Sequence, residues 1–270
     1  MHASWNALAK GRGEPRGDRL SFMTALTSAE CVMGLCLLPF FPAPGAAALP
    51  YLVASSVLHV GYVLFLTEAY AHGDLAQIYP IARGAAPLMV AVVGMTLLHE
   101  DVGATKALAI LCIGLGVIAM SLRGGADLGR LPPRALFYAL GTAGFTAAYT
   151  IVDALGARAS GAASAYTAAM FVLSGAGFVG LNLARRGVRA LAFEPAVWRS
   201  GAMAGVLSVL AYWVAVWAFT QAPVALVSAL RETSVLMAML IGVFVLREPG
   251  GRWRWIAGGL IAGGVALMRA

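Results

Sequence analysis

Charged residues are scarce in this chain of 270 residues. Asp, Glu, Lys and Arg make up 11% of it, whereas soluble domains have about 25%. Hydrophobic residues reach 60%, and the mean hydropathy is +0.82. A soluble fold of this length could not bury that much apolar surface. The composition therefore predicts a membrane protein with several spans, which lies in a lipid bilayer.

The sequence also lacks the signatures of cofactor and enzyme sites. Its three cysteines, Cys31, Cys36 and Cys112, form no CxxC pair, which argues against a zinc site and a disulfide framework. There is no P-loop, HExxH or GxSxG motif, so we expect no metal, no cofactor and no nucleotide-driven step. The basic residues form no patch interleaved with aromatic residues, which excludes nucleic acid as an expected partner.

Apolar stretches recur along the whole chain, each close to the length of about 20 residues that a helix needs to cross a bilayer. They cover residues 22–42, 49–71, 74–98, 103–122, 134–154, 162–184, 196–220, 223–246 and 252–268. Helices are predicted because each satisfies its own backbone hydrogen bonds in lipid. The opening segment HASWNALAK resembles the tail of one more helix, so we expect about ten helices, the first incomplete, in a natural chain that begins upstream.

The second half of the chain repeats the first. Arg83–Met120 aligns without gaps on Arg231–Met268, and a register shorter by one residue places Asn6 over Asp153. We therefore predict an all-α protein of two halves, residues 1–123 and 134–270, with five helices each. An odd number of helices inverts the second half in the membrane, as in secondary transporters.

Four segments resemble a known family. HASWNALAK, YPIARGAAPL, LLHEDVGATKALAILCIGLGVIAM and ALRETSVLMAMLIGVFVLRE are similar to EamA-domain proteins of the drug/metabolite transporter (DMT) superfamily. The resemblance covers both halves. It implies ten helices in two inverted EamA repeats, a central cavity, and export or uptake of small metabolites.

Basic residues in the loops indicate an orientation. One side carries Lys10, Arg12, Arg16, Arg19, Arg123, Arg130, Arg134, Arg185, Arg186, Arg189, Arg199, Arg247, Arg252 and Arg254, and the other side carries Lys106, Arg158 and Arg269. The positive-inside rule makes the first side cytoplasmic and places both chain ends outside. The family resemblance implies the opposite, with both ends in the cytoplasm, so both orientations stay open. The expected location is the plasma (inner) membrane of a bacterium.

Arg83 is the most unusual residue of the apolar stretches. A charge near the bilayer centre costs about 2.5–3.5 kcal/mol on insertion scales, so it normally faces a cavity or a partner. On a helix it shares a face with Tyr79 and Pro87, and Pro80 and Pro87 remove backbone hydrogen bonds and predict a kink. We predict that Arg83 lines a cavity and contacts an anionic substrate. The alternative is an arginine that snorkels to the headgroups.

The repeat adds further candidates for the substrate cavity. They are Arg231, His59, Tyr62, Tyr149, Asp153, Tyr212, Asn6 and Trp5. Glu30, Glu68 and Glu232 are candidates for proton or counter-ion sites, and His59 and Asp153 are also candidate proton carriers. Each has a structural alternative: a packed histidine, an ion pair between neighbours, or an interfacial role for Asp153, which lies near the predicted helix end. Glu100 and Glu248 are predicted to anchor helix ends, and the small residues of Cys112–Val117 and Gly259–Gly264 to pack within the chain.

Two classes of function remain, a secondary transporter and a membrane-embedded enzyme or scaffold. Within the first class we predict export of a small metabolite, because two arginines with tyrosines suit an amino acid or another polar anion. The alternatives are a small-multidrug-type proton antiporter of cationic drugs, which needs an acid deep in its cavity, and a membrane-embedded enzyme or scaffold. The proton is a candidate coupling ion, and a monomer and a homodimer are both compatible with the sequence.

Overall fold

Long helices make up nearly all of the computed structural model, which describes residues 16–72, 75–121, 132–244 and 251–269. The elements are α2 (Arg16–Leu37), η1 (Leu38–Phe40), η2 (Ala46–Ala48), α3 (Leu49–His72), α4 (Leu75–Thr96), α5 (Gly103–Ser121), α6 (Pro133–Ser160), α7 (Ala163–Arg186), η4 (Gly187–Leu191), α8 (Pro195–Phe219), α9 (Val224–Arg231), α10 (Thr233–Phe244) and α11 (Arg252–Leu267). These described residues contain no strand, so the all-α prediction is confirmed.

The lengths of the helices agree with membrane spans. Eight helical segments of the described chain are long and apolar enough to cross a bilayer. They correspond to the predicted stretches from residues 22–42 to 223–246. The last predicted stretch is α11, which has 16 residues and is shorter than the length of about 20 that a perpendicular span needs. Trp5, Asn6 and Glu248 lie outside the described residues.

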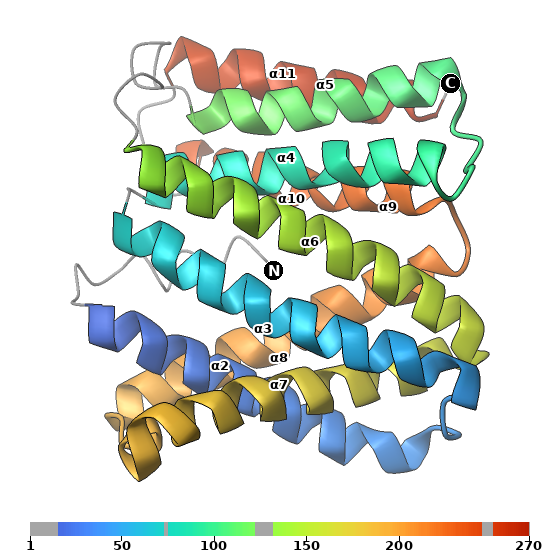
Figure 1. Cartoon of the computed structure of the whole chain (residues 1–270). Helices are drawn as coiled ribbons and strands as arrows, with labels where there is room; N and C mark the ends of the chain where they lie inside the picture. Colours follow the sequence, from blue (N-terminus) through green and yellow to red (C-terminus); the bar gives the residue numbers. More distant parts are fainter. Residues whose placement is uncertain (1–15, 73–74, 122–131, 245–250, 270) are drawn as a thin grey trace. The chain divides into compact units, whose positions relative to one another are not determined.

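The helices pack into two compact units, and each unit draws on both halves of the sequence. Unit 1 contains Met1–Thr67 and Val152–Gln221, and unit 2 contains Glu68–Ile151 and Ala222–Ala270. Within unit 1, α2 packs against α7 and α8. Within unit 2, α5 packs against α4 and α11, which Figure 1 shows beside it. The helices α3 and α6 continue from one unit into the other.

Glycines let α5 and α11 approach each other closely. A Cβ atom at Gly116 would lie 2.8 Å from Cγ1 of Ile261, and one at Gly264 would lie 2.7 Å from Cγ1 of Ile113. The repeat alignment pairs Gly116 with Gly264 and Ile113 with Ile261, so the contact is reciprocal, as across a local two-fold axis. Because Gly116 meets Ile261 and Ile113 meets Gly264, the two helices run antiparallel. The predicted packing of these small residues within the chain is confirmed.

This close contact predicts that alanine destabilises the protein at Gly264 and not at the neighbouring Gly263. In Gly264→Ala the new Cβ would lie 2.8 Å from the Ala109 carbonyl oxygen, a backbone atom that cannot rotate away. We expect the free energy of unfolding to fall by about 1–3 kcal/mol. Gly263→Ala is the control, since nothing lies within 4 Å of its Cβ and alanine favours the helix. Thermal unfolding of the purified proteins in detergent measures both, and equal midpoints would contradict the packing.

The span predicted at residues 223–246 is not one continuous helix, which corrects the sequence analysis. α9 ends at Arg231 and α10 begins at Thr233. Between them the amide of Glu232 donates to the carbonyl of Ala229 at 3.0 Å, so the turn tightens from an i→i−4 to an i→i−3 bond. Discontinuous helices are where transporters place polar groups within the membrane. No proline or glycine marks this position, and hydropathy alone therefore predicted an unbroken helix.

Glu100, four residues after the end of α4, anchors the start of α9. The backbone N–H of Val224, the first residue of α9, donates to the two carboxylate oxygens of Glu100 at 3.1 and 2.9 Å. A negative charge at a helix N-terminus is stabilising. A Cβ at Gly94 would lie 3.2 Å from this carboxylate, so glycine leaves room for it. The predicted anchoring role of Glu100 is confirmed.

Candidate functional site

Asp153 is a carboxylate that the fold buries completely. It lies on α6, which continues to Ser160, about two turns further along. The prediction that Asp153 lies near a helix end is therefore wrong. The apolar stretch ended at residue 154 because glycine, arginine and serine follow, but these residues still extend the helix.

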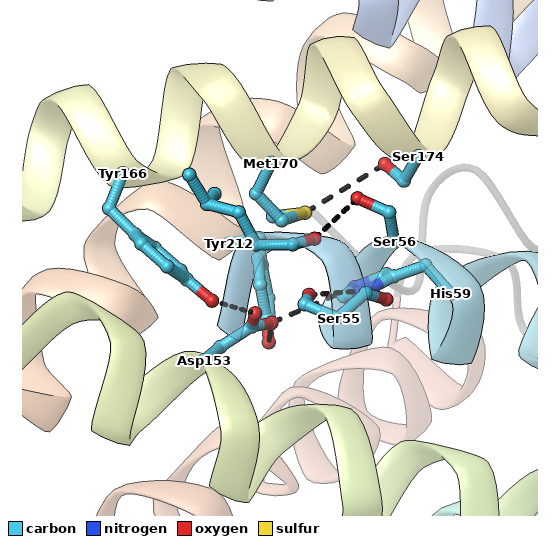
Figure 2. Close-up of polar contacts among 9 residues, drawn as sticks. Ser55, Ser56, His59, Asp153, Tyr166, Met170, Ser174 and Tyr212 are labelled. Carbon is cyan, nitrogen blue, oxygen red and sulfur yellow. Dashed lines mark hydrogen bonds and ion pairs between the residues drawn. The ribbon is translucent and has the colours of Figure 1, made fainter. Parts of the chain in front are cut away.

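Two tyrosine hydroxyls hold the Asp153 carboxylate within unit 1. Tyr166 on α7 donates to Oδ1 at 2.9 Å, and Tyr212 on α8 donates to Oδ2 at 2.6 Å (Figure 2). Each carboxylate oxygen thus has a hydrogen-bond donor, as a buried charged group requires. Gly156, one turn after Asp153, makes room for the aromatic ring, because a Cβ there would overlap Tyr166.

His59 on α3 faces the same carboxylate. Its Nε2 lies 3.9 Å from Oδ2 of Asp153, and its side chain is 16% exposed while that of Asp153 is 0% exposed. Its Nδ1 lies 3.0 Å from the carbonyl oxygen of Ser55 and 3.2 Å from the Ser55 hydroxyl. The imidazole packs edge-on against the ring of Tyr212. The structure therefore brings together three of the predicted residues, His59, Asp153 and Tyr212.

Sequence reasoning missed Tyr166. The turn at Gly161, whose φ is +66°, lies between the end of α6 and the start of α7. Asp153 lies eight residues before Gly161 and Tyr166 five residues after it, so both lie within about two helical turns of the same connection. The position of Tyr166 relative to the predicted turn was thus the signal that could have identified it.

A buried ion pair forms within unit 2. Arg83 on α4 lies 3.0 Å through its terminal nitrogen from Oε1 of Glu232, and the side chains are 10% and 4% exposed. Glu232 is the residue at the break between α9 and α10. The guanidinium carbon lies 5.9 Å from the centre of the Tyr79 ring, within the range of a cation–π contact. Arg231 is close enough to interact electrostatically with Glu232.

The remaining candidates lie elsewhere within the two units. Glu30 is buried on α2 and hydrogen-bonds to Ser208 of α8. Glu68 lies 3.9 Å from His72, one turn along α3, and both are part-exposed. The part-exposed Tyr62 is on α3 and the buried Tyr149 on α6, while Pro80 and Pro87 lie inside the unbroken α4. Among the described residues no group of three His, Cys, Asp or Glu side chains could hold a metal ion.

Comparisons with known proteins address the family and the fold. The model of the EamA-like transporter family matches residues 133–270, just over half of the chain. A crystal structure of another protein is similar with a TM-score of 0.73 and 18% identity, over 99% of this chain and 92% of that one, which establishes the fold. No curated protein matches. The family predicted from the sequence is confirmed, and this chain belongs to the EamA-like transporter family, as an integral membrane transporter of small molecules.

Proposed function

We propose that the protein is a secondary transporter that exports an amino acid or another small polar anion across the inner membrane of a bacterium. The proposed architecture has ten helices in two inverted repeats, residues 1–123 and 134–270. The reciprocal contact of Gly116 and Gly264 supports it, since both glycines occupy the same position of their repeat. Antiparallel packing of equivalent helices is what an inverted pair requires.

The observation that carries the proposed substrate is the buried pair of Arg83 and Glu232. A buried ion pair contributes little net stability, because desolvation of both charges offsets their attraction. Charges inside a membrane span usually have a role in transport. A guanidinium presents a planar fork that matches a carboxylate. We propose that a substrate carboxylate exchanges with that of Glu232 on Arg83, beside the ring of Tyr79.

Two other candidate side chains of unit 2, Arg231 and Tyr149, take part in this exchange in the proposal. Arg231 adds a second positive charge next to Glu232, which favours an anion at this place in unit 2. Tyr149 interacts electrostatically with Tyr79 and is a proposed substrate contact. Tyr62 and Tyr212 belong to unit 1 and are not assigned to this exchange.

A second candidate function, antiport of cationic drugs, is favoured by one observation. Asp153 is a fully buried carboxylate, the type of group that a drug cation would bind. Both of its oxygens already accept hydrogen bonds from tyrosine hydroxyls, at 2.9 and 2.6 Å. A bulky cation would have to displace them, so we propose the anion as substrate.

Transport by the purified protein in proteoliposomes tests the two functions. The probes are a panel of radiolabelled amino acids, the matching amino acid amides, and tetraphenylphosphonium as a lipophilic cation, each with and without a pH gradient. We expect at least one amino acid to be transported and its amide, which lacks the carboxylate, to be excluded. Transport of the cation or of the amides in place of the acids would overturn the anion proposal.

A further inference from the structure

We propose that His59 and Asp153 bind one exchangeable proton between them, and that this pair is the proton-coupling site of the transporter. The inference rests on the proposed function of secondary transport. It names the coupling ion and assigns it to residues of unit 1.

The hydrogen bonds of the His59 imidazole indicate which ring nitrogen can bind the added proton. Nδ1 of His59 lies 3.0 Å from the backbone carbonyl oxygen of Ser55. A carbonyl can only accept, so we place the proton of the neutral ring on Nδ1, where the Ser55 hydroxyl oxygen at 3.2 Å can accept it as well. Nε2 then has a lone pair, and it faces Oδ2 of Asp153 at 3.9 Å. Two acceptors face each other, and a proton added at Nε2 turns their repulsion into an ion pair.

Binding of a proton changes the net charge of the buried His59–Asp153 pair. Without the added proton the site holds one negative charge, the carboxylate of Asp153, which two tyrosine hydroxyls stabilise. Uptake of one proton at Nε2 makes an imidazolium beside the carboxylate, with no net charge, and release reverses this. A charge is costly within a membrane span, so proton binding changes the energy of this part of the protein. The His59 side chain is 16% exposed and that of Asp153 0%, so in the proposal the proton enters through the imidazole.

Side chains from two other helices face His59, and one from a third helix binds its carboxylate partner. Asp153 on α6 and Tyr212 on α8 face its ring directly, and Tyr166 on α7 donates to the same carboxylate. Among the described residues of unit 1 the other buried acid is Glu30, which hydrogen-bonds to Ser208. The acid that faces the imidazole is therefore Asp153.

The same helix provides a matched comparison. His72 lies 3.9 Å from Glu68, the separation found for His59 and Asp153, but the side chains of this second pair are 30% and 29% exposed. Water and salt screen a pair of this kind. The variants His72→Gln and Glu68→Gln therefore control for the loss of a histidine or an acid from α3.

Nuclear magnetic resonance of histidine-labelled protein in lipid nanodiscs tests the site without substrate. The chain has four histidines, and the signal that disappears in His59→Gln is that of His59. We expect this signal to change with pH as His59 takes up and releases its proton. Asp153→Asn removes the negative charge and should lower the proton affinity of His59 about tenfold or more. Tyr166→Phe removes a donor from the carboxylate and should raise that affinity.

One variant serves as a control, and three results of the titration would overturn the proposal. Glu68→Gln should leave the His59 titration unchanged. A His59 signal that does not titrate in the unaltered protein would overturn the proposal, and so would an unchanged His59 titration in Asp153→Asn. If Asp153→Asn fails to fold, the opposite shift expected for Tyr166→Phe still tests the site, and an unchanged titration there would overturn it.

Transport measurements connect the proton to function. For the substrate found with the amino acid panel, His59→Gln should lose its response to a pH gradient, while His72→Gln should keep it. A pH response that survives in His59→Gln would overturn the coupling role. Failure of the anion proposal would appear separately, as transport of amides or cations, because the resonance titration contains no substrate.

Discussion

Arg83→Lys is expected to lower transport of the carboxylate substrate by about 10- to 100-fold, since a charge-assisted hydrogen bond contributes about 1.5–3 kcal/mol. Lysine keeps the positive charge and therefore its attraction to Glu232, which lies 3.0 Å from the guanidinium. It loses the planar fork that binds both oxygens of a carboxylate. Folding and membrane insertion should survive. Initial rates in proteoliposomes, with the amount of folded protein measured by size-exclusion chromatography, give the comparison.

Two further variants separate a substrate site from a structural ion pair. The double variant Arg83→Leu with Glu232→Leu removes both buried charges, which is often neutral or stabilising. We expect a folded protein without transport; a folded double variant that transports normally would show that the pair is structural. Arg158→Lys is the control, because Nε of Arg158 donates to the carbonyl of Phe219. It loses the same planar fork and should transport normally.

Gly156→Ala is expected to disturb the proton site from a distance of one helical turn. The new Cβ would lie 2.5 Å from Cζ of Tyr166 and 2.6 Å from its hydroxyl oxygen. The buried ring cannot move aside without losing its 2.9 Å bond to Asp153. We expect the free energy of unfolding to fall by about 1–3 kcal/mol. The His59 titration should shift in the direction expected for Tyr166→Phe, because both variants remove the same donor.

Gly144→Ala is the matched control on α6. Nothing lies within 4 Å of a Cβ at this position, and alanine favours a helix over glycine by about 1 kcal/mol. Its stability should stay equal or rise, and its His59 titration should not change. If Gly156→Ala behaved like Gly144→Ala in both measurements, Tyr166 would not be held between Gly156 and Asp153.

Much of the architecture follows from the sequence alone, because the bilayer imposes the same requirement on every span. Apolar stretches of sufficient length must form helices in lipid, and the start of α8 at Pro195 and the end of α3 at His72 lie within a residue of the predicted limits. The repeat identified the contact between α5 and α11 from glycines that recur at the same position of each half. The family followed from the same segments.

Only the tertiary structure decided which polar side chains meet. Hydropathy treats Arg83 as a single costly residue, and it cannot identify Glu232 as its partner, because that pairing depends on how α4 packs against the broken helix. The sequence placed Asp153 at a helix end, whereas packing buries it under Tyr166 and Tyr212. Membrane insertion depends on the average polarity of a segment, which can be calculated residue by residue. A hydrogen-bonded cluster depends on directions and distances between segments, which exist only after the helices have packed.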